Sequence, residues 1–241
     1  MKVSILIPYF GDRSQQLRRS LPFLKHQTYE DYEIILVNDG SYMPEDLADE
    51  FDNYYRIRID KSPSRASNYA YRKAFSESTG DFIIVSHPEI LIPYDGVERM
   101  VAECDMTRRN VATQYHLTCE AVQELFRSHV YPTWAYDFDN IKKVHGFWAI
   151  QTPWLYPNSI SHRYRNHFTF SGSTRERFEE YMIPATDEWG MEDGWVHKRE
   201  LENNEPSLPI EIEVYHQEHD RVYGTIPEYS VRMRRIRNSR L

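Results

Sequence analysis

Residues 34–41 read IILVNDGS, and a second apolar run, VSILIPYF, precedes them at residues 3–10. Both runs are continuous rather than alternating, which is typical of strands buried on both faces of a parallel sheet. In sheets of this kind, ligands bind beyond the carboxyl ends of the strands. Asp39 and Ser41 directly follow the second run, so we expect this carboxylate and hydroxyl to face a crevice rather than a core.

The chain of 241 residues is long enough to bury one sizeable core, and no stretch rich in proline, glycine or serine divides it. We therefore expect one compact domain that carries a large additional segment. The formal net charge of −8 disfavours nonspecific binding to a phosphate backbone, which argues against nucleic acid as the main partner. Two cysteines are too few for a disulfide framework, so a reduced, cytoplasmic protein is expected.

The amino terminus leads straight into a strand without the apolar region of a signal peptide, and no apolar run reaches about 18 residues. These patterns predict a protein that is soluble or at most peripheral at a membrane. The C-terminal stretch is basic and is suited to meet phosphates or an anionic membrane surface, whereas a solvated terminal helix is the alternative. Its arginines are Arg232, Arg234, Arg235, Arg237 and Arg240.

The first hundred residues alternate between strand and helix signals, which is the pattern of a parallel sheet with crossover helices. Strands are predicted at residues 3–8, 32–37, 54–59 and 82–85, with helices around residues 17–24, 47–51 and 65–75. This order outlines a nucleotide-binding half-sheet.

Beyond Pro93 the periodicity predicts amphipathic helices at residues 97–104 and 121–126. Residues 131–170 are rich in aromatic residues with little periodicity, which suits contacts with sugar rings or bases, or else a packed insertion. A capping box from Ser173 to Glu176 predicts a helix, and residues 210–215 read as a strand.

Three acidic positions are candidates for chemistry. Asp39 is placed to accept hydrogen bonds from a base or ribose, although a turn-forming role also fits. Glu89 follows the fourth strand in the sequence His87-Pro88-Glu89, where a carboxylate can hold a divalent cation and His87 can add a nitrogen, the alternative being a charged turn.

The third acidic position is the pair Glu192 and Asp193, within WGMEDGW at residues 189–195. Two acids at a helix N-terminus are kept charged by the helix dipole, so at least one is available as a base. Near the end of the predicted strand at 210–215, His216 and His219 can offer a ring nitrogen to a metal, or they are ordinary surface histidines.

Taken together, these motifs resemble the family 2 glycosyltransferases of the GT-A fold. The resemblance rests on SILIPY, ILVNDGS, ASN with GDFI, FSGS with RF, WGMED and YHQE, in that order, and it covers residues 1–93 and 168–221. The YHQE motif is similar to one in bacterial chondroitin and hyaluronan polymerases, which implies polysaccharide biosynthesis.

The resemblance implies an α/β fold with a Rossmann-like mixed sheet, mostly parallel and flanked by helices, carrying an aromatic-rich insertion and a C-terminal helical tail. It divides the single domain into a nucleotide-binding half at 1–93, a variable insertion at 94–167, an acceptor half at 168–221 and a basic tail at 222–241.

By position, the resemblance also implies site roles. The nucleobase and ribose site would be lined by Pro8, Tyr9 and Asp39, with Ser41 beside them and Arg65 near the diphosphate. His87-Pro88-Glu89 stands in place of the Asp-x-Asp motif of the family, so His87 would take the role of the first aspartate and Glu89 would bind the cation. His216 would complete a metal site that suits Mn²⁺ somewhat better than Mg²⁺.

Asp193 matches the general base, and Glu192 would contact the acceptor or donor sugar. The expected reaction is an inverting transfer of a sugar from a nucleoside diphosphate sugar, with UDP favoured, to a hydroxyl of a glycan or glycolipid. Two alternatives remain: a nucleotide-sugar-binding protein impaired by its altered metal motif, and a sugar nucleotidyltransferase, for which the basic glycine-rich loop is missing.

Overall fold

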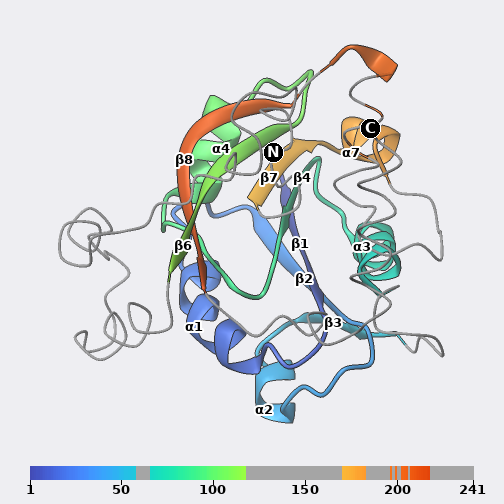
Figure 1. Ribbon diagram of the computed structural model, residues 1–241, viewed down its shortest axis with the longest axis vertical. Coiled ribbons are helices and arrows are strands. Elements are labelled where there is room, and N and C mark those ends of the chain that lie inside the picture. Colours follow the sequence, from blue (N-terminus) through green and yellow to red (C-terminus); the bar gives the residue numbers. More distant parts are fainter. Residues whose placement is uncertain are drawn as a thin grey trace, which may run out of the picture.

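The computed structural model describes residues 1–57, 66–117, 170–182, 196, 199, 202–205 and 207–217. Within this part, eight strands form one mixed sheet in the order β3-β2-β1-β4-β7-β6-β8-β5 (Figure 1). The order 3-2-1-4 in its first half is the order of the Rossmann half-sheet, as the sequence predicts.

The first half of the sheet is parallel. Its strands are β1 (Val3–Tyr9), β2 (Tyr32–Asn38), β3 (Asn53–Arg56) and β4 (Phe82–Ser86). Every residue of β1 and β4 is buried, because neighbouring strands and covering helices enclose both strands. The carboxyl ends of these four strands therefore meet at one edge of the sheet.

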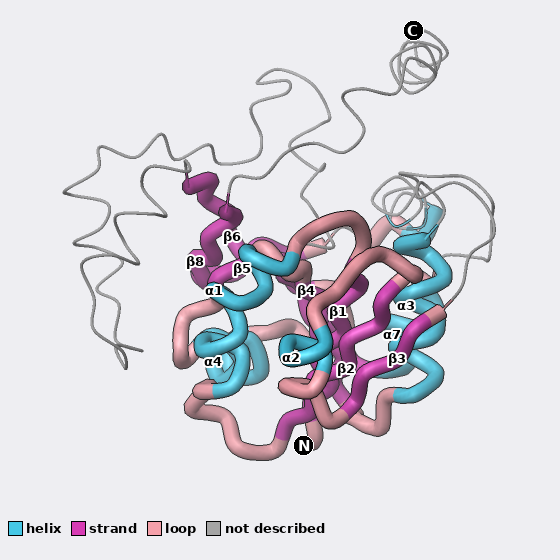
Figure 2. Tube along the Cα trace, turned by 90° about the horizontal axis from the view of Figure 1, so that it is seen from below, coloured by secondary structure: helices cyan, strands magenta, loops and turns pink. Residues whose placement is uncertain are grey.

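Helices cover both faces of the sheet (Figures 1 and 2). On one face lie α1 (Ser14–Lys25), α2 (Glu45–Ala48) and α4 (Gly96–Glu103), whose apolar residues pack with Val3, Ile5 and Ile7. On the other face lie α3 (Ala66–Glu77) and α7 (Arg175–Glu180). Their core includes Leu6, Ile35, Ala70, Tyr71, Phe178 and Val196.

In the second half of the sheet, the strand predicted at residues 210–215 is present, whereas the sequence patterns did not predict the other strands. β7 (Phe170–Thr174) runs antiparallel to β4 and also pairs with β6 (Asn110–Leu117). β8 (Leu208–Gln217) runs parallel to β6, and the short β5 (Ile90–Leu91) pairs antiparallel with β8. α4 and β6 lie within the stretch expected to be a variable insertion, yet both belong to the sheet and its covering layer.

The predicted capping box is wrong in its register. Ser173 lies in β7 and is 1% exposed, and the N-cap of α7 is Thr174, whose hydroxyl accepts a hydrogen bond from the backbone of Arg177 at 3.4 Å. The neighbouring Gly172 is required by packing, because a Cβ there would lie 2.6 Å from Phe82 and 2.9 Å from Met100.

Several expectations fall outside the described residues. These are the predicted helix at 121–126, the aromatic stretch up to residue 169 and the basic tail at 222–241. The third predicted strand is described as β3 through Arg56, and its last predicted residues also fall outside.

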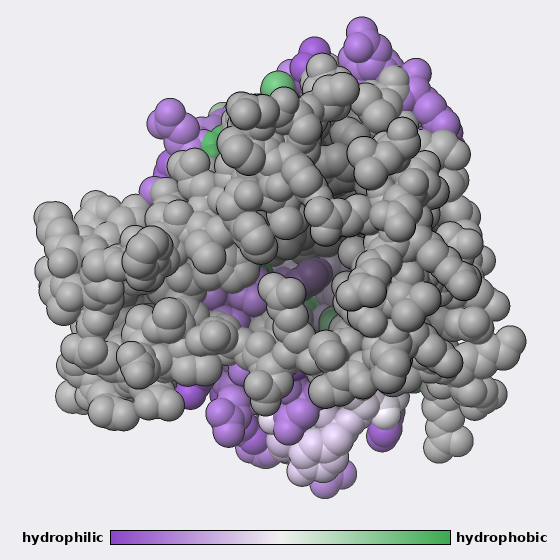
Figure 3. Space-filling model, in the orientation of Figure 1, coloured by the Kyte–Doolittle hydropathy of each residue, from purple (hydrophilic) through white to green (hydrophobic). Residues whose placement is uncertain are grey.

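The described surface seen in the space-filling view is predominantly hydrophilic (Figure 3). Large apolar side chains that are exposed in the described part are Met1, Tyr42, Tyr94 and Met106. Among the described helices, none has both the length and the apolar character needed to cross a membrane.

Candidate functional site

Asp39 and Ser41 tie together the loops that follow β1 and β2. The Ser41 hydroxyl donates to Oδ1 of Asp39 at 2.5 Å and accepts the backbone N–H of Gly11 at 2.7 Å. The backbone N–H of Ser41 also donates to Oδ1 of Asp39, at 2.9 Å, and the backbone N–H of Asp39 donates to the carbonyl of Tyr9 at 3.0 Å. The two loops therefore form one hydrogen-bonded unit at the carboxyl edge of the sheet.

Gly40 allows the chain to turn between these two residues. Its φ of +103° is a backbone conformation that side chains disfavour, and a Cβ there would lie 3.2 Å from the carbonyl oxygen of Ile57. Asn38 closes the turn, because its side chain accepts the N–H of Gly40 and donates to the carbonyl of Ser41. The turn-forming role considered for Asp39 is thus present in the structure.

The carboxylate of Asp39 is poorly solvated. It is 8% exposed, and this burial raises its pKa above the ordinary value, although the hydrogen bonds from Ser41 oppose the shift. Acids with a raised pKa are frequent at functional sites, which makes Asp39 a candidate ligand-binding residue.

Pro8 and Tyr9 lie at the end of β1 and are both buried. Tyr9 is 0% exposed, its hydroxyl donates to the carbonyl of Tyr42 at 3.0 Å, and it accepts the backbone N–H of Arg13 at 3.3 Å. Burial raises the pKa of this phenol. Tyr9 thus fixes the backbone of the two loops, while the neighbouring Tyr42 is 72% exposed.

Glu89 lies in a tight turn at the same edge of the sheet. The carbonyl of His87 accepts the N–H of Ile90 at 3.1 Å, and Pro88 occupies the turn position where its fixed φ fits. The carbonyl of Pro88 accepts the hydroxyl of Ser20 in α1 at 2.7 Å, which anchors the turn. Turn carboxylates are usually solvated, but Glu89 is 6% exposed.

Two histidines face this buried carboxylate. Oε1 of Glu89 lies 3.5 Å from Nδ1 of His87 and 3.5 Å from Nε2 of His216. The short β5 makes the approach possible, because Ile90 pairs with His216 and the backbone N–H of Gln217 donates to the carbonyl of Glu89 at 3.0 Å. Glu89 and His216, more than a hundred positions apart in the sequence, thus lie within 3.5 Å of one another.

Tyr71 is part of this cluster and carries no signal in the sequence. It lies in α3 and is 3% exposed, and its hydroxyl lies 2.7 Å from Nε2 of His87. In the sequence it stands beside alanines that repeat at helical spacing, which predicts a packing role only.

The turn at Asp39 and the turn at Glu89 lie at the same end of the sheet, where β1, β2 and β4 have their carboxyl ends. β1 is the one strand between β2 and β4, so the ends of these strands lie about 10 Å apart at the usual strand spacing. The buried carboxylates of Asp39 and Glu89, the second of which is flanked by two imidazoles, therefore lie at the same end of the sheet.

Carboxylate oxygens and imidazole nitrogens together suit a divalent first-row cation. In the described part of the chain, no three or more His, Cys, Asp or Glu side chains are arranged to hold a metal ion by themselves. Glu89 and His216 fit a cation as a partial ligand pair, which needs oxygens from a bound substrate to complete the coordination shell.

Three predicted site residues, Arg65, Glu192 and Asp193, lie outside the described residues.

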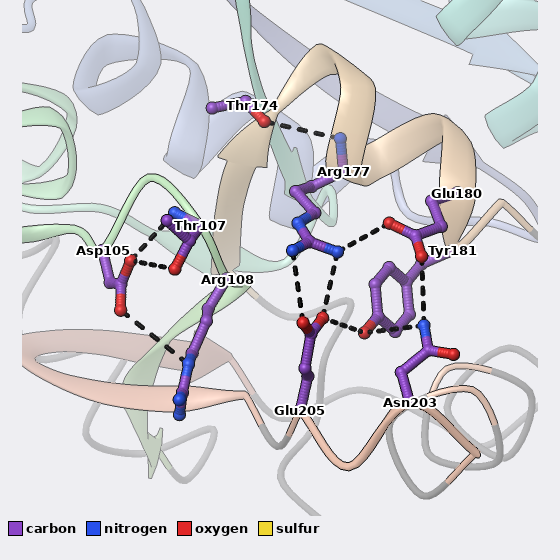
Figure 4. A network of polar contacts seen from close by, with 9 residues as sticks. All are labelled: Asp105, Thr107, Arg108, Thr174, Arg177, Glu180, Tyr181, Asn203 and Glu205. Carbon is purple, nitrogen blue, oxygen red and sulfur yellow. Dashed lines mark hydrogen bonds and ion pairs between the residues drawn. The ribbon is translucent and has the colours of Figure 1, made fainter.

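Polar contacts connect the described residues that precede residue 183 with those that follow residue 195. Arg177 forms ion pairs with Glu180 at 2.7 Å and Glu205 at 2.9 Å, and the hydroxyl of Tyr181 lies 3.4 Å from Glu205 (Figure 4). Val196 is fully buried in the same apolar cluster as Tyr71.

The model of the family described as "Glycosyl transferase family 2" matches residues 4–165, which is more than half of the chain. The chain belongs to this family. The match includes the middle of the chain, which the sequence motifs left uncovered, and it ends before the acceptor-side motifs at 168–221.

Two curated relatives are similar to the chain. An undecaprenyl-phosphate 4-deoxy-4-formamido-L-arabinose transferase of Proteus mirabilis (strain HI4320) is 30% identical over 112 residues, which is 43% of this chain and 34% of the relative. The transferase of the same name from Enterobacter sp. (strain 638) is 30% identical over 116 residues, again 43% of this chain and 34% of the relative. The match thus spans about a third of the length of these relatives.

Solved structures share the fold at low sequence identity. S. aureus TarS 1–349, determined with UDP, has a TM-score of 0.59 at 13% identity, covering 90% of this chain and 61% of TarS 1–349. The mannosyltransferase PcManGT of Pyrobaculum calidifontis, with GDP-Man and Mn²⁺, gives 0.57 at 13%, covering 92% and 58%. GalNAc-T7 with UDP, GalNAc and Mn²⁺ gives 0.62 at 13%, covering 91% and 44%.

These comparisons agree with the architecture. The chain is a member of glycosyltransferase family 2 and has the GT-A fold, a mixed α/β sheet flanked by helices.

Proposed function

We propose that the protein transfers a sugar from a nucleoside diphosphate sugar to an acceptor hydroxyl with inversion at the anomeric carbon, assisted by a divalent cation. The observation that carries the proposal is Glu89, a turn carboxylate that is 6% exposed and lies 3.5 Å from Nε2 of His216 at the carboxyl edge of the sheet. Burying a carboxylate is costly unless a positive or hydrogen-bonding partner compensates it.

The donor lies along this edge in the proposal. Asp39 accepts a hydrogen bond from the base or ribose, and Ser41 holds the Asp39 carboxylate in place. Pro8 and Tyr9 stabilise the loops that follow β1 and β2. Arg65 meets the diphosphate. A UDP-sugar is favoured because TarS was determined with UDP and with UDP-GlcNAc, but PcManGT was determined with GDP-Man, so both nucleotides belong in any screen.

Glu89 and His216 would hold Mn²⁺ or Mg²⁺, which supplies positive charge against the departing diphosphate. Asp193 takes the proton of the acceptor hydroxyl as its oxygen attacks the anomeric carbon, and Glu192 contacts one of the sugars. The acceptor is a glycan or glycolipid, and the names of the curated relatives include a lipid phosphate.

The test begins with the nucleotide. A thermal-shift panel of UDP-sugars and GDP-Man, with and without Mn²⁺, should reveal a donor that raises the melting temperature, because a ligand specific to the folded state stabilises it.

With that donor, Asp193→Asn should lower turnover about 10²- to 10⁴-fold while donor affinity stays the same. Asp52→Asn, at an exposed aspartate, serves as the matched control and should leave both unchanged. Near-normal turnover of Asp193→Asn would reject the assignment of the base. Donor binding without donor hydrolysis or transfer in the unmodified protein would instead indicate the impaired binding protein.

A further inference from the structure

The hydroxyl of Tyr71 requires an explanation beyond packing. Tyr71 is 3% exposed, in an apolar cluster with Val85, Ala70 and Ala74. Burying a hydroxyl costs free energy unless it finds a hydrogen-bond partner, so a phenylalanine would fill the same space more simply. The hydroxyl lies 2.7 Å from Nε2 of His87, and a phenylalanine could not make this bond.

This bond decides how the imidazole of His87 is oriented. The two ring nitrogens of a histidine are distinct, and the bond made by one determines what the other presents. With Nε2 held against α3, Nδ1 of the ring lies 3.5 Å from Oε1 of Glu89. The His87 side chain is 25% exposed and the Glu89 side chain 8%, so the pair lies at the boundary between core and solvent.

We infer that Tyr71 is a positioning residue of the proposed donor site, whose hydroxyl holds His87 by Nε2 and thereby presents Nδ1 to Glu89. The inference deepens the proposed function and rests on it for the role of the site. A chain of side chains then links α3 to β8, in the order Tyr71, His87, Glu89 and His216.

A phenol suits this task because its hydroxyl both donates and accepts. When Tyr71 donates to Nε2, the proton of a neutral His87 is on Nδ1 and points at the Glu89 carboxylate. When Nδ1 must present its lone pair toward a bound group, Nε2–H donates to Tyr71 instead. Histidines at metal sites commonly use the second nitrogen in this way, and loss of the outer partner typically costs 10- to 100-fold in affinity or activity.

The direct test reads the tautomer of His87 in the ligand-free full chain. Long-range proton–nitrogen NMR of the imidazoles, at about pH 8 where an ordinary histidine is neutral, distinguishes Nδ1–H from Nε2–H. A His87→Gln spectrum assigns the signal among the ten histidines. Tyr71→Phe removes only the hydroxyl, and Tyr32→Phe, which removes a hydroxyl bonded to the carbonyl of Leu24, is the control.

The wild type and Tyr32→Phe should show His87 locked as the Nδ1–H tautomer, and Tyr71→Phe should shift it toward Nε2–H, the form that free histidine favours in water. The same His87 signals in wild type and Tyr71→Phe would overturn the inference, because a merely structural phenol would leave them unchanged. A Tyr71→Phe protein that melts within a few degrees of the wild type rules out general misfolding.

A second readout connects the tautomer to the site. Affinity for the nucleotide sugar found in the thermal-shift panel, measured with Mn²⁺, should fall about 10-fold in Tyr71→Phe and stay the same in Tyr32→Phe. If no nucleotide sugar binds the wild type, the proposed function fails while the tautomer result still decides the role of Tyr71. If the tautomer shifts but affinity is unchanged, Tyr71 positions His87 without serving the donor, and the inference is overturned.

Discussion

Ser41 controls the charge state of Asp39 as well as its position. Its hydroxyl and its backbone N–H both donate to Oδ1 of the carboxylate, at 2.5 and 2.9 Å. Hydrogen bonds to the charged form of an acid lower its pKa, whereas burial raises it. At Asp39 burial prevails, so the pKa lies above the ordinary value, and Ser41 limits the shift.

The pH dependence of nucleoside binding should therefore follow Asp39. Uridine is the suitable ligand because it has no phosphate that titrates in the same range. Its affinity should be full above the pKa of Asp39 and fall as the pH decreases through it, with a midpoint above the ordinary aspartate value of about 3.9. NMR titration of uridine at a series of pH values measures the midpoint.

Two variants sharpen this prediction. Ser41→Ala removes a donor to the charged form, so the midpoint should move to higher pH. Asp39→Asn should bind more weakly with no dependence on pH in this range. An unchanged midpoint in Ser41→Ala, or a pH dependence that survives in Asp39→Asn, would show that another group controls binding.

The sequence indicated the acidic residues of the candidate site more readily than the residues that hold them in place. Asp39 and Glu89 are visible because each follows an apolar strand, and His216 because it ends one. The turn that buries Glu89 depends on Ser20 in α1 and on β5, and the contact of Tyr71 with His87 depends on how α3 packs against β1 and β2. No local pattern encodes such contacts, because they arise only when the sheet is assembled.

Among the elements, the buried parallel strands, their crossover helices and β8 were predictable, while β5, β6 and β7 were not. β5 has two residues, too few for any periodicity. β7 reads FSGST, and its serines and glycine resemble a helix start, yet it lies in the sheet between β4 and β6. Small residues are suited to this place because Phe82 and Met100 pack directly against Gly172.

At the amino ends of the parallel strands, the side chain of Glu33 in β2 accepts hydrogen bonds from β1 and from the turn before β4. Oε1 accepts the hydroxyl of Ser4 at 2.6 Å and the backbone N–H of Thr79 at 2.7 Å, and Oε2 lies 3.2 Å from Nζ of Lys2. Burial alone raises the pKa of Glu33, but the hydrogen bonds from Ser4 and Thr79 outweigh it and the pKa lies below the ordinary value.

Glu33 should therefore stabilise the fold in a pH-dependent way. Because its folded pKa is lowered, its contribution is present above the unfolded value of about 4.3 and is lost as the pH falls through the folded value. Glu33→Gln should reduce the free energy of unfolding by about 1 to 2 kcal/mol at pH 7. Denaturant unfolding at pH 7 and at pH 3 measures the change.

The difference between wild type and Glu33→Gln should shrink toward pH 3. Glu30→Gln, at an exposed glutamate on the same edge, is the control and should be neutral. An equal loss of stability at both pH values would mean that the side chain matters for its shape and not for its charge.

At the scale of the whole molecule, the amino ends and the carboxyl ends of the parallel strands carry different groups of polar residues. The edge where β1 and β2 begin carries the Glu33 network, which is structural. The carboxyl edge carries the Asp39 and Glu89 turns, and the pairing of β8 with β6 and β5 brings His216 to within 3.5 Å of Glu89. The order of the sheet, more than any single motif, creates the candidate site.

The most direct test of this account is a crystal structure of the full chain with Mn²⁺ and the nucleotide that gives the largest thermal shift. The account predicts an anomalous manganese peak within about 2.5 Å of a Glu89 carboxylate oxygen and of a ring nitrogen of His216, shared with the diphosphate, and the base beside Asp39. A manganese peak elsewhere, or a nucleotide bound away from the carboxyl ends of β1, β2 and β4, would contradict it.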